Sequence, residues 1–421
     1  MTVNRRLFLA ASALASPVLT TGSRFAAAEP APTGEQGPVV TGADRLAAEG
    51  WRRLAGRKVG VLSNPTGVLA DGDHVVDSLV AAGVRPVAAF GPEHGFRGSA
   101  QAGGSEGDYA DPRTGIPVYD AYGANAETLA GMFTKAGVDT VVFDIADVGA
   151  RFYTYIWSMY TAMVAAARTG AAFVVLDRPN PVGGTACGPM LDPAFSSGVG
   201  LKPIVQQHGM TVGELARFFA AEFLPAEGVR PAELEVVQTR GWRRSQLFVE
   251  TGLAWTPPSP NMPTPDTALV YPGTCLFEGT LFSEARGTTR PFEIIGAPGV
   301  DWRWREKLGE QDLPGVRFRE AYFVPTFGKF TGQTCGGVQI VVTQPRAFDA
   351  IRTAVAMIVT ARRLHPAIFG WREDRFVDKL FGSARLRTMV DRGAGTDEIV
   401  GSWRQELAEF TGRREPYLSY R

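Results

Sequence analysis

An acidic side chain inside a glycine-rich stretch is the first candidate for chemistry in this sequence. Glu93 follows the apolar run Val84 to Phe90, which predicts a strand, so Glu93 is expected just past the carboxyl end of that strand. In an open α/β sheet this edge is where ligands bind. The glycines around Glu93 would let the backbone turn tightly and approach a ligand. Glu93 is therefore our first catalytic candidate; the alternative is a surface loop whose Glu93 and His94 face water.

Polar side chains follow other predicted strands as well. Asn64, the pair Asp144 and Asp147, and the pair Asp177 and Asn180 each come directly after a short apolar run. Because the carboxyl ends of parallel strands meet at one edge of a sheet, these groups are expected to line one site. Asp and Asn also favour turns and helix caps, so part of the set could be structural.

Several kinds of catalysis find no support in the sequence. The four histidines are isolated from one another, whereas a zinc site needs closely spaced ligands. The first predicted strand is not followed by the glycine fingerprint of a dinucleotide site. Gly103 to Gly107 matches the nucleophile-elbow pattern of serine hydrolases, but it lacks the strand before and the helix after. We therefore expect neither a metal nor a cofactor.

Carboxylate chemistry remains, and glycoside hydrolysis is one form of it. The reaction needs an acid that protonates the leaving oxygen and a second group, usually a carboxylate. Glu93 could fill one role, and Asp144, Asp147, Glu284 or Glu293 could fill the other. Tyr153 and other aromatic residues near these loops could stack on a sugar ring, or pack in the core. Arginines could bind a substrate carboxylate or brace a loop acid, and the candidates are Arg97, Arg151, Arg178, Arg286 and Arg290.

The order of predicted elements indicates an α/β fold with a mostly parallel sheet. Strand-like runs alternate with helical patterns through the first half, which is the rhythm of βαβ units. The predicted strands cover residues 58–62, 84–90, 140–143, 172–176, 318–323 and 337–342, and the predicted helices cover residues 74–82, 126–136, 155–168, 215–223, 347–364 and 396–410. Thr211 and Glu214 predict a capping box for the fourth of these helices.

A proline-rich connector divides the chain. Residues 255–265 contain five prolines, which can continue neither a helix nor a central strand. Since 421 residues exceed what one core usually supports, two domains are the default expectation. We expect a catalytic domain over residues 46–264 and a smaller C-terminal α/β domain over residues 265–421 that closes one side of a cleft.

The amino terminus resembles an export signal. Arg5 and Arg6 precede a weakly apolar run that ends at Leu19, and Ala26 to Ala28 offers small residues for cleavage. Residues 1–28 are therefore expected to be a twin-arginine-like signal, with a general secretory signal as the alternative. Residues 29–45 are expected to be a disordered lead-in. The mature protein is expected to be periplasmic or extracellular.

Composition argues against other classes of partner. The numbers of basic and acidic side chains are equal at 43 each, and no basic run occurs, which disfavours nucleic acid. Beyond the amino terminus no apolar run is long enough to span a bilayer. The three cysteines are too few for a disulfide framework. We expect buried thiols, with a Cys275–Cys335 bridge as the alternative.

Several motifs, taken in order, resemble a known family. They are Gly91-Pro92-Glu93-His94-Gly95, residues 144–155, Asp177-Arg178-Pro179-Asn180-Pro181, His208-Gly209-Met210-Thr211, Pro257-Pro258-Ser259-Pro260-Asn261 and residues 284–296. Together they resemble the exo-β-N-acetylmuramidase family, the NamZ-type peptidoglycan hexosaminidases, over about residues 46–420. The resemblance implies a Rossmann-like first domain whose catalytic glutamate is Glu93. It also implies release of single N-acetylmuramic acid units from the non-reducing ends of glycan fragments.

With this resemblance the predicted site is complete. Glu93 is the predicted general acid, with Glu284 or Asp144 as the second catalytic group. The predicted substrate contacts are Asn64, His94, Arg97, Asp147, Arg151, Tyr153, Asp177, Asn180, Asn261, Arg286 and Arg290. Arg151, with Arg286 or Arg290, would bind the lactyl carboxylate of the substrate.

Two positions depart from the family pattern. Ala146 stands where we expect Gln, which removes a possible hydrogen bond to a sugar, and Ala285 stands where we expect Gly. The substrate preference within the family is therefore left open. The competing interpretation of the whole chain is an exported two-domain carbohydrate-binding receptor without catalysis.

Overall fold

The computed structural model describes residues 37–421. The predicted export signal and the first part of the predicted lead-in lie outside these residues. Residues 37–45 differ from the expected disordered lead-in. Val39 donates its backbone N–H to Thr251 O and Val40 to Arg240 O, both at 2.9 Å, and Thr41 caps helix α1 (Gly42–Ala48). Val39 is also buried, so this segment gains both hydrogen bonds and apolar contact by packing on the protein.

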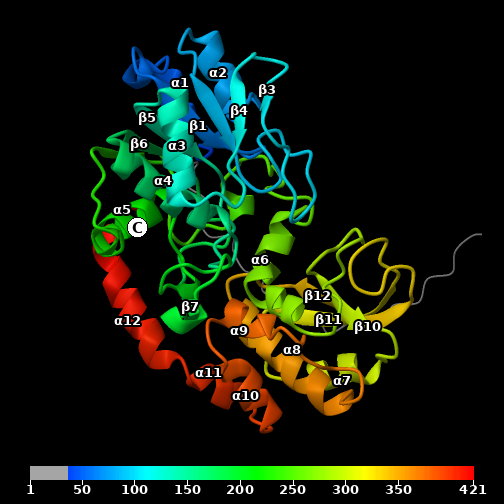
Figure 1. The fold of residues 1–421 in the computed structure, drawn as a ribbon. Helices are drawn as coiled ribbons and strands as arrows, with labels where there is room; N and C mark the ends of the chain where they lie inside the picture. The colour runs from blue at the N-terminus through cyan, green and yellow to red at the C-terminus, as the bar shows by residue number, and fades with distance from the viewer. Residues whose placement is uncertain (1–36) are drawn as a thin grey trace, which may run out of the picture. The chain divides into compact units, whose positions relative to one another are not determined.

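The largest sheet within residues 37–421 has seven strands and is parallel except at one edge (Figure 1). Across the sheet the strands are β3 (Tyr109–Ala110), β4 (Pro117–Asp120), β2 (Ala88–Gly91), β1 (Val59–Ser63), β5 (Thr140–Asp144), β6 (Ala172–Leu176) and β9 (Leu234–Val237). Only β3 pairs antiparallel, with β4. The predicted α/β class with a mostly parallel sheet is confirmed.

Helices cover both faces of this sheet. On one face lie α3 (Ala126–Ala136), α4 (Tyr155–Thr169) and α5 (Val212–Glu222), and on the other lie α1 and α2 (Val75–Ala81). Successive residues of a strand point to opposite faces, so Val141 and Phe143 join the first layer while Val142 joins the second. Strands buried on both faces must be apolar throughout, which is why they are visible in the sequence as continuous hydrophobic runs.

The order of the strands creates a crevice at the carboxyl edge of the sheet. β1 lies between β2 and β5, so the chain leaves β1 toward β2 on one side and later continues from β5 on the other side. The loops that follow β1 and β5 therefore diverge. Such a switch point is where doubly wound sheets bind their ligands.

The C-terminal region is built around a separate antiparallel sheet. Its strands, in order, are β10 (Ile294–Ala297), β12 (Cys335–Val342) and β11 (Val316–Phe323). Its helices are α6 (Pro265–Thr274), α7 (Arg303–Gly309), α8 (Ala350–Leu364), α9 (Phe376–Phe381), α10 (Arg385–Asp391), α11 (Thr396–Gly401) and α12 (Arg404–Arg414). A two-stranded sheet of β7 (Cys187–Met190) and β8 (Val205–Gln207) precedes it. Helix α8 lies at the centre of this region, where it packs on α6, α7 and α11.

The last residues of the chain return to the first domain. The Tyr420 hydroxyl donates to Asp177 Oδ2 at the end of β6. The backbone N–H of Ser419 donates to Glu214 Oε1 at 2.7 Å. Arg414, at the end of α12, donates to backbone carbonyls just before α5. The carboxyl end of the polypeptide thus completes the packing of the parallel sheet.

Most predicted elements are found within a few residues of their expected bounds, including the capping box of α5. The predicted strand at 84–90 is shorter, because β2 begins at Ala88. The predicted helix at 396–410 is two helices, because α11 ends at Gly401 and Trp403 turns its ring into the core against Phe381. Residues 251–264 form neither helix nor strand. The three cysteines are free thiols, so the alternative Cys275–Cys335 bridge is absent from this structure.

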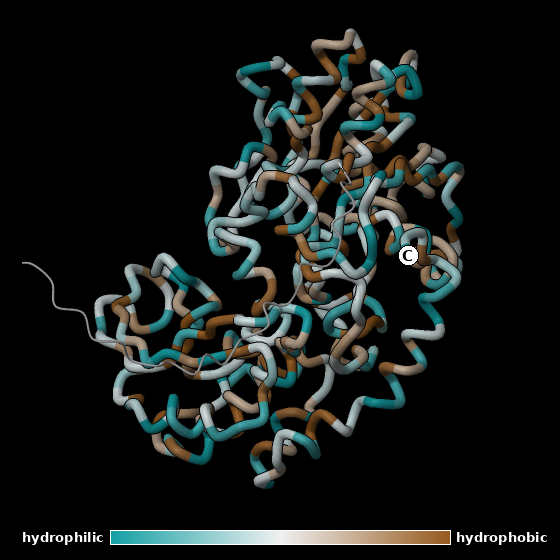
Figure 2. Tube along the Cα trace, turned by 180° about the vertical axis from the view of Figure 1, so that it is seen from behind, coloured by the Kyte–Doolittle hydropathy of each residue, from teal (hydrophilic) through white to brown (hydrophobic). Residues whose placement is uncertain are grey.

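Helix α12 is mainly hydrophilic (Figure 2). Of α12, only Phe410 and Arg414 are buried. No helix within residues 37–421 combines the length and the hydrophobicity needed to cross a membrane.

Candidate active site

Glu93 lies two residues beyond the end of β2, at the carboxyl edge of the sheet, as predicted. The loop that carries it is organised by the Glu106 carboxylate. Glu106 accepts the backbone N–H groups of residues 97 and 99, at 3.2 and 2.9 Å, and the Tyr109 hydroxyl at 2.9 Å. Gly95 has a φ of +89°, and a Cβ there would lie 2.1 Å from Glu106 Cδ. Only glycine fits this position, so the glycine-rich composition shapes the loop.

The Glu93 carboxylate is half-buried and is oriented by two hydrogen bonds. Oε1 accepts the N–H of Gly103 at 2.9 Å, and Oε2 accepts the Thr154 hydroxyl at 3.3 Å. The Tyr155 hydroxyl links the Glu93 loop to the proline-rich connector. It lies within hydrogen-bond distance of Pro258 O, at 2.8 Å, and of Glu93 O, at 3.3 Å. A carboxylate has about four acceptor positions, so Glu93 keeps acceptor capacity for a ligand.

His94, the next residue, holds an unusual backbone conformation. Its φ is +70°, in the left-handed region that residues other than glycine rarely adopt. Its Nδ1 lies 3.1 Å from Ala100 O, and its side chain is buried. Strain of this kind persists only where the surrounding structure enforces it, and it clusters at functional sites.

Glu93 opens onto a cavity of about 130 Å³. Its lining comes from both predicted domains: Glu93, His94, Ala102, Phe152, Tyr153, Thr154, Tyr155, Val199, Ser259 and Met262 from the first, and Tyr271, Cys275, Glu278, Arg286, Phe292 and Leu380 from the second. Of the residues predicted for the site, the structure brings together Glu93, His94, Tyr153 and Arg286. We call this space the Glu93 cavity.

Aromatic rings form much of its wall. Tyr153 packs edge-to-face on Tyr155 and on Tyr271, with 5.3 and 5.6 Å between ring centroids. Tyr271 packs in the same way on Phe292, at 4.8 Å. The Tyr153 hydroxyl is buried and has no hydrogen-bond partner within residues 37–421. A sugar would therefore meet apolar ring surfaces and one unsatisfied hydroxyl.

Glu278 is a second acid in the Glu93 cavity that the sequence prediction missed. It lies in a 3-10 turn, η5 (Cys275–Gly279), and its side chain, 19% exposed, is bound by Arg286. Burial raises the pKa of Glu278 above its ordinary value, although the Arg286 charge acts in the opposite direction. A lone acid within the apolar run Cys275 to Phe282 was the available sequence signal, because such a charge is rarely buried without a purpose.

Glu284, predicted as a second catalytic group, does not line the cavity. Its carboxylate lies 3.0 Å from Lys329 Nζ and 3.4 Å from Arg286 Nε, and the residue is 5% exposed. Lys329 also donates to the carbonyls of Phe277 and Phe282, at 2.9 and 2.8 Å. In this structure Glu284 therefore supports Arg286 and the turn that carries the second acid.

Asp144, the other predicted second group, is fully buried away from the cavity. Arg178 binds it with two hydrogen bonds, from Nε at 2.6 Å and from Nη2 at 2.9 Å. Burial raises the pKa of Asp144, and the Arg178 charge opposes this effect. The pair joins the ends of β5 and β6, so the catalytic prediction for Asp144 is corrected to a bracing role.

Three predicted arginine contacts are also corrected. Arg151 is fully buried and donates to the carbonyls of residues 189, 204 and 380, at 3.0, 3.0 and 2.7 Å, so it cannot reach a substrate. Arg97 is occupied by Asp77 and Asp111, with four hydrogen bonds of 2.8–3.1 Å. Arg290 pairs with a neighbouring glutamate at 3.0 Å and does not line the cavity.

The predicted Asn and Asp contacts from the strand ends mostly hold the backbone. Asp177 accepts from Gly213 N at 2.7 Å, and Asn180 donates to Met210 O at 2.9 Å; both are buried. Asn64 Oδ1 accepts from the backbone N–H two residues later, at 2.9 Å, in a turn after β1. Asn261 is buried, and none of these four residues lines the Glu93 cavity. Asp147 lines a different cavity, described below.

Models of one family match nearly the whole described chain. The N-terminal model of the exo-β-N-acetylmuramidase NamZ matches residues 59–266, and its C-terminal model matches residues 269–420. The chain belongs to the NamZ family. A curated NamZ relative is the peptidoglycan β-N-acetylmuramidase NamZ of Bacillus subtilis (strain 168), which is 44% identical over 391 residues, covering 92% of this chain and 93% of the relative.

Solved structures resemble the NamZ-family chain throughout. A DUF1343 family protein from Bacteroides fragilis superposes with a TM-score of 0.81 at 31% identity. A second protein of that family and organism superposes with a TM-score of 0.73 at 29% identity. Each match covers 91% of this chain and 99% of the solved chain. The two-domain α/β architecture is thus shared with these structures.

Proposed function

We propose that the chain is an exo-acting glycoside hydrolase that releases N-acetylmuramic acid from the non-reducing ends of peptidoglycan fragments. Membership of the NamZ family and the 44% identity to a peptidoglycan β-N-acetylmuramidase support this function. The structural observation that carries it is the Glu93 cavity, where two acids, an arginine and a wall of aromatic rings face one small space. Carboxylates also accept hydrogen bonds from sugar hydroxyls in carbohydrate receptors, so hydrolysis of the substrate is the property that separates the two functions.

The two acids match the requirements of glycoside hydrolysis. Glu93 is our general acid, because it is half-exposed, held by neutral donors and free of an ion pair within the described residues. Glu278 is the second carboxyl group, positioned by Arg286. The two residues come from different domains, so the catalytic pair is complete only when both domains are in place.

The test is release of N-acetylmuramic acid by wild type and by Glu93→Gln, on a nitrophenyl muramic acid glycoside and on the natural disaccharide. Loss of a general acid lowers the rate by roughly 10²- to 10⁴-fold. The loss should be larger on the disaccharide, because its leaving group needs protonation and nitrophenolate does not. If Glu278→Gln rather than Glu93→Gln shows this leaving-group dependence, the two roles are exchanged. Intact disaccharide with the wild-type protein would support the receptor instead.

Arg286 is our remaining candidate for the lactyl carboxylate of muramic acid. It lines the cavity, and its guanidinium lies 4.9 Å from the Phe292 ring centroid. Arg286→Lys keeps the charge but loses the planar fork that matches a carboxylate. We expect roughly tenfold higher KM for a muramic acid glycoside and also a lower kcat, because Arg286 positions Glu278. An unchanged KM would remove Arg286 from lactyl recognition.

We further propose that the protein is exported, because its substrate belongs to the cell wall and the arginine pair at residues 5 and 6 precedes an apolar run. The double variant Arg5→Lys/Arg6→Lys tests this in cell fractions. Retention of the variant in the cytoplasm supports twin-arginine export. Unchanged secretion of the variant would instead support the general secretory signal.

A further inference from the structure

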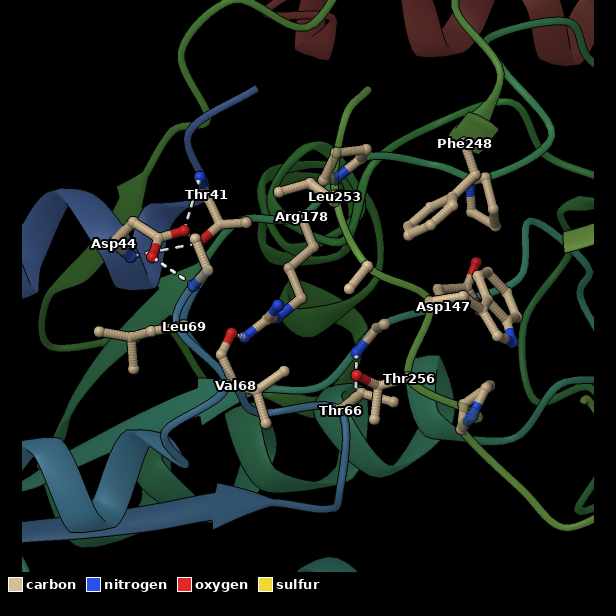
Figure 3. A pocket seen from close by; sticks show the side chains of 18 residues that line it. Thr41, Asp44, Thr66, Val68, Leu69, Asp147, Arg178, Phe248, Leu253 and Thr256 are labelled. Atoms are coloured by element: carbon tan, nitrogen blue, oxygen red, sulfur yellow. Dashed lines mark hydrogen bonds between the residues drawn. The ribbon is translucent and has the colours of Figure 1, made fainter. Parts of the chain in front are cut away.

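A second cavity lies at the same edge of the sheet, separate from the one that holds Glu93. It has a volume of about 110 Å³ (Figure 3). The loop after β1 contributes Thr66 and Val68, the loop after β5 contributes Ala146 and Asp147, and the connector contributes Trp255. The connector also divides the two cavities, because Pro258 lines this one and Ser259 lines the Glu93 cavity. We call it the switch-point cavity.

Its position follows from the strand order. The lining segments leave β1 and β5, the two adjacent strands at which the direction of winding reverses. That crevice is the usual ligand site of a doubly wound sheet. In this protein the proposed catalytic acid, Glu93, lies on the loop after β2 instead. The crevice between β1 and β5 therefore has no role in the proposed reaction.

One buried acceptor in the switch-point cavity lacks a donor. Asp147 is 5% exposed, and its Oδ2 accepts from Gly149 N at 2.7 Å and from His208 Nε2 at 3.0 Å. His208 Nδ1 accepts the N–H of Met210, which assigns the ring proton to Nε2. The other oxygen, Oδ1, has no hydrogen-bond partner within residues 37–421. A buried acceptor is costly when unpaired, so an N–H or O–H group of a ligand would be bound there favourably.

The charges of the lining disfavour an anionic ligand. Arg178 is the only arginine among the lining residues, and Asp144 neutralises it in the hydrogen-bonded pair described above. Asp44 and Asp147 also line the cavity, and neither has a lysine or arginine partner within residues 37–421. The net charge of the lining is therefore negative. A negative lining repels the lactyl carboxylate of muramic acid and favours a neutral ligand.

The remaining lining is apolar and includes two aromatic rings. Around the polar groups lie Val68, Leu69, Leu253 and Phe248 (Figure 3). Trp255 also lines the cavity. Phe248 packs edge-to-face on Trp255, with 4.8 Å between the ring centroids, which fixes both rings. Apolar rings beside a few polar groups are typical of sites that bind neutral sugar rings, whose faces are apolar and whose edges carry donors.

We propose that the switch-point cavity binds a neutral N-acetylhexosamine ring, with an N–H or O–H of the sugar donating to Asp147 Oδ1. This proposal rests on the proposed function, because peptidoglycan fragments contain such uncharged rings next to each muramic acid. The site recognises the glycan outside the cavity where the bond is cleaved. It would hold a fragment on the enzyme through a sugar that is not itself hydrolysed.

The test uses calorimetric titration with the neutral disaccharide of β-1,4-linked N-acetylglucosamine. Wild type and Glu93→Gln should each bind one equivalent. Ala146→Leu places a larger apolar side chain in the switch-point cavity and should weaken binding roughly 10- to 100-fold, the range expected for overfilling a packed site. Ala146→Ser, which keeps the space, should bind like wild type. Thermal melting of each variant shows that the fold is retained.

Unweakened binding by Ala146→Leu, or no binding by the wild type at the solubility limit of the disaccharide, would overturn the proposal. Loss of binding in Glu93→Gln would also overturn it, by placing the disaccharide in the Glu93 cavity. Ala146→Leu should retain wild-type kcat on the nitrophenyl glycoside, since position 146 does not line the Glu93 cavity. Full hydrolysis by Glu93→Gln would refute the proposed catalytic site and leave this binding result standing.

Discussion

Asp177 offers a quantitative test of the distinction between bracing and substrate-binding acids. Its carboxylate is fully buried at the end of β6 and accepts hydrogen bonds from Gly213 N, the Thr211 hydroxyl and the Tyr420 hydroxyl. Burial raises the pKa of Asp177 from 3.8 to about 6, against the opposing effect of these donors. The sequence suggested a substrate contact, whereas the structure makes it a junction between β6, α5 and the carboxyl end of the chain.

The sign and size of the effect follow from this pKa. A carboxyl whose pKa is raised on folding favours the folded state when protonated, so its ionisation reduces stability as pH rises from 3.8 through 6. Using these two values, the reduction is roughly 2 kcal/mol at pH 5 and roughly 3 kcal/mol at pH 7. Wild type should therefore lose on the order of 1 kcal/mol between pH 5 and pH 7 from this residue alone.

Asp177→Asn removes the titration and keeps the shape, because the amide can donate to the two hydroxyls that the carboxylate accepted from. Urea unfolding at pH 5 and pH 7, followed by tryptophan fluorescence, should show the wild type losing on the order of 1 kcal/mol more than the variant. Tyr420→Phe is the matched control, since it removes one donor and keeps the titrating acid. Equal pH dependence in wild type and Asp177→Asn would refute this account, and a raised KM in the variant would restore the substrate-contact role.

Three further predictions follow from contacts described above. Glu106→Gln should lower kcat several-fold by loosening the loop that carries Glu93. Burial alone would raise the pKa of Glu106, but the Ser99 N–H stabilises the carboxylate charge and the pKa is lowered. The kcat of the wild type, measured as a function of pH, should therefore decline similarly as the pH falls through that pKa. Arg151→Met should destabilise by about 3 kcal/mol in urea unfolding and leave KM unchanged, because it leaves three buried carbonyls without donors. Unfolded protein should react with three equivalents of a thiol reagent without prior reduction.

Local sequence pattern predicted the elements and the position of the first acid well. Strands buried on both faces must be continuous apolar runs, and the Thr211–Glu214 capping box is a local signal, so both are visible without tertiary information. The placement of Glu93 at the end of β2 followed from the same pattern. These features depend on residues that are close together in the sequence.

The partners of the other predicted residues could not be found in this way. The carbonyls that hold Arg151 belong to residues 189, 204 and 380, and those contacts exist only after the domains pack. Arg178 neutralises Asp144 across two strands, which turns a plausible catalytic acid into a brace. Glu278 was missed although it stands alone in the apolar run Cys275 to Phe282, because that local signal indicates burial but not which cavity the acid lines. Charged side chains are thus predictable in position but not in pairing.

The return of the carboxyl end to the parallel sheet constrains when this protein can finish folding. Asp177 and Glu214 accept hydrogen bonds from Tyr420 and Ser419, which follow them in the sequence by 243 and 205 positions. A nascent polypeptide therefore exposes these two acids until residue 420 has been synthesised, and the first domain cannot complete its packing before then. Removal of residues 419–420 would therefore leave two buried acids of the first domain without these donors.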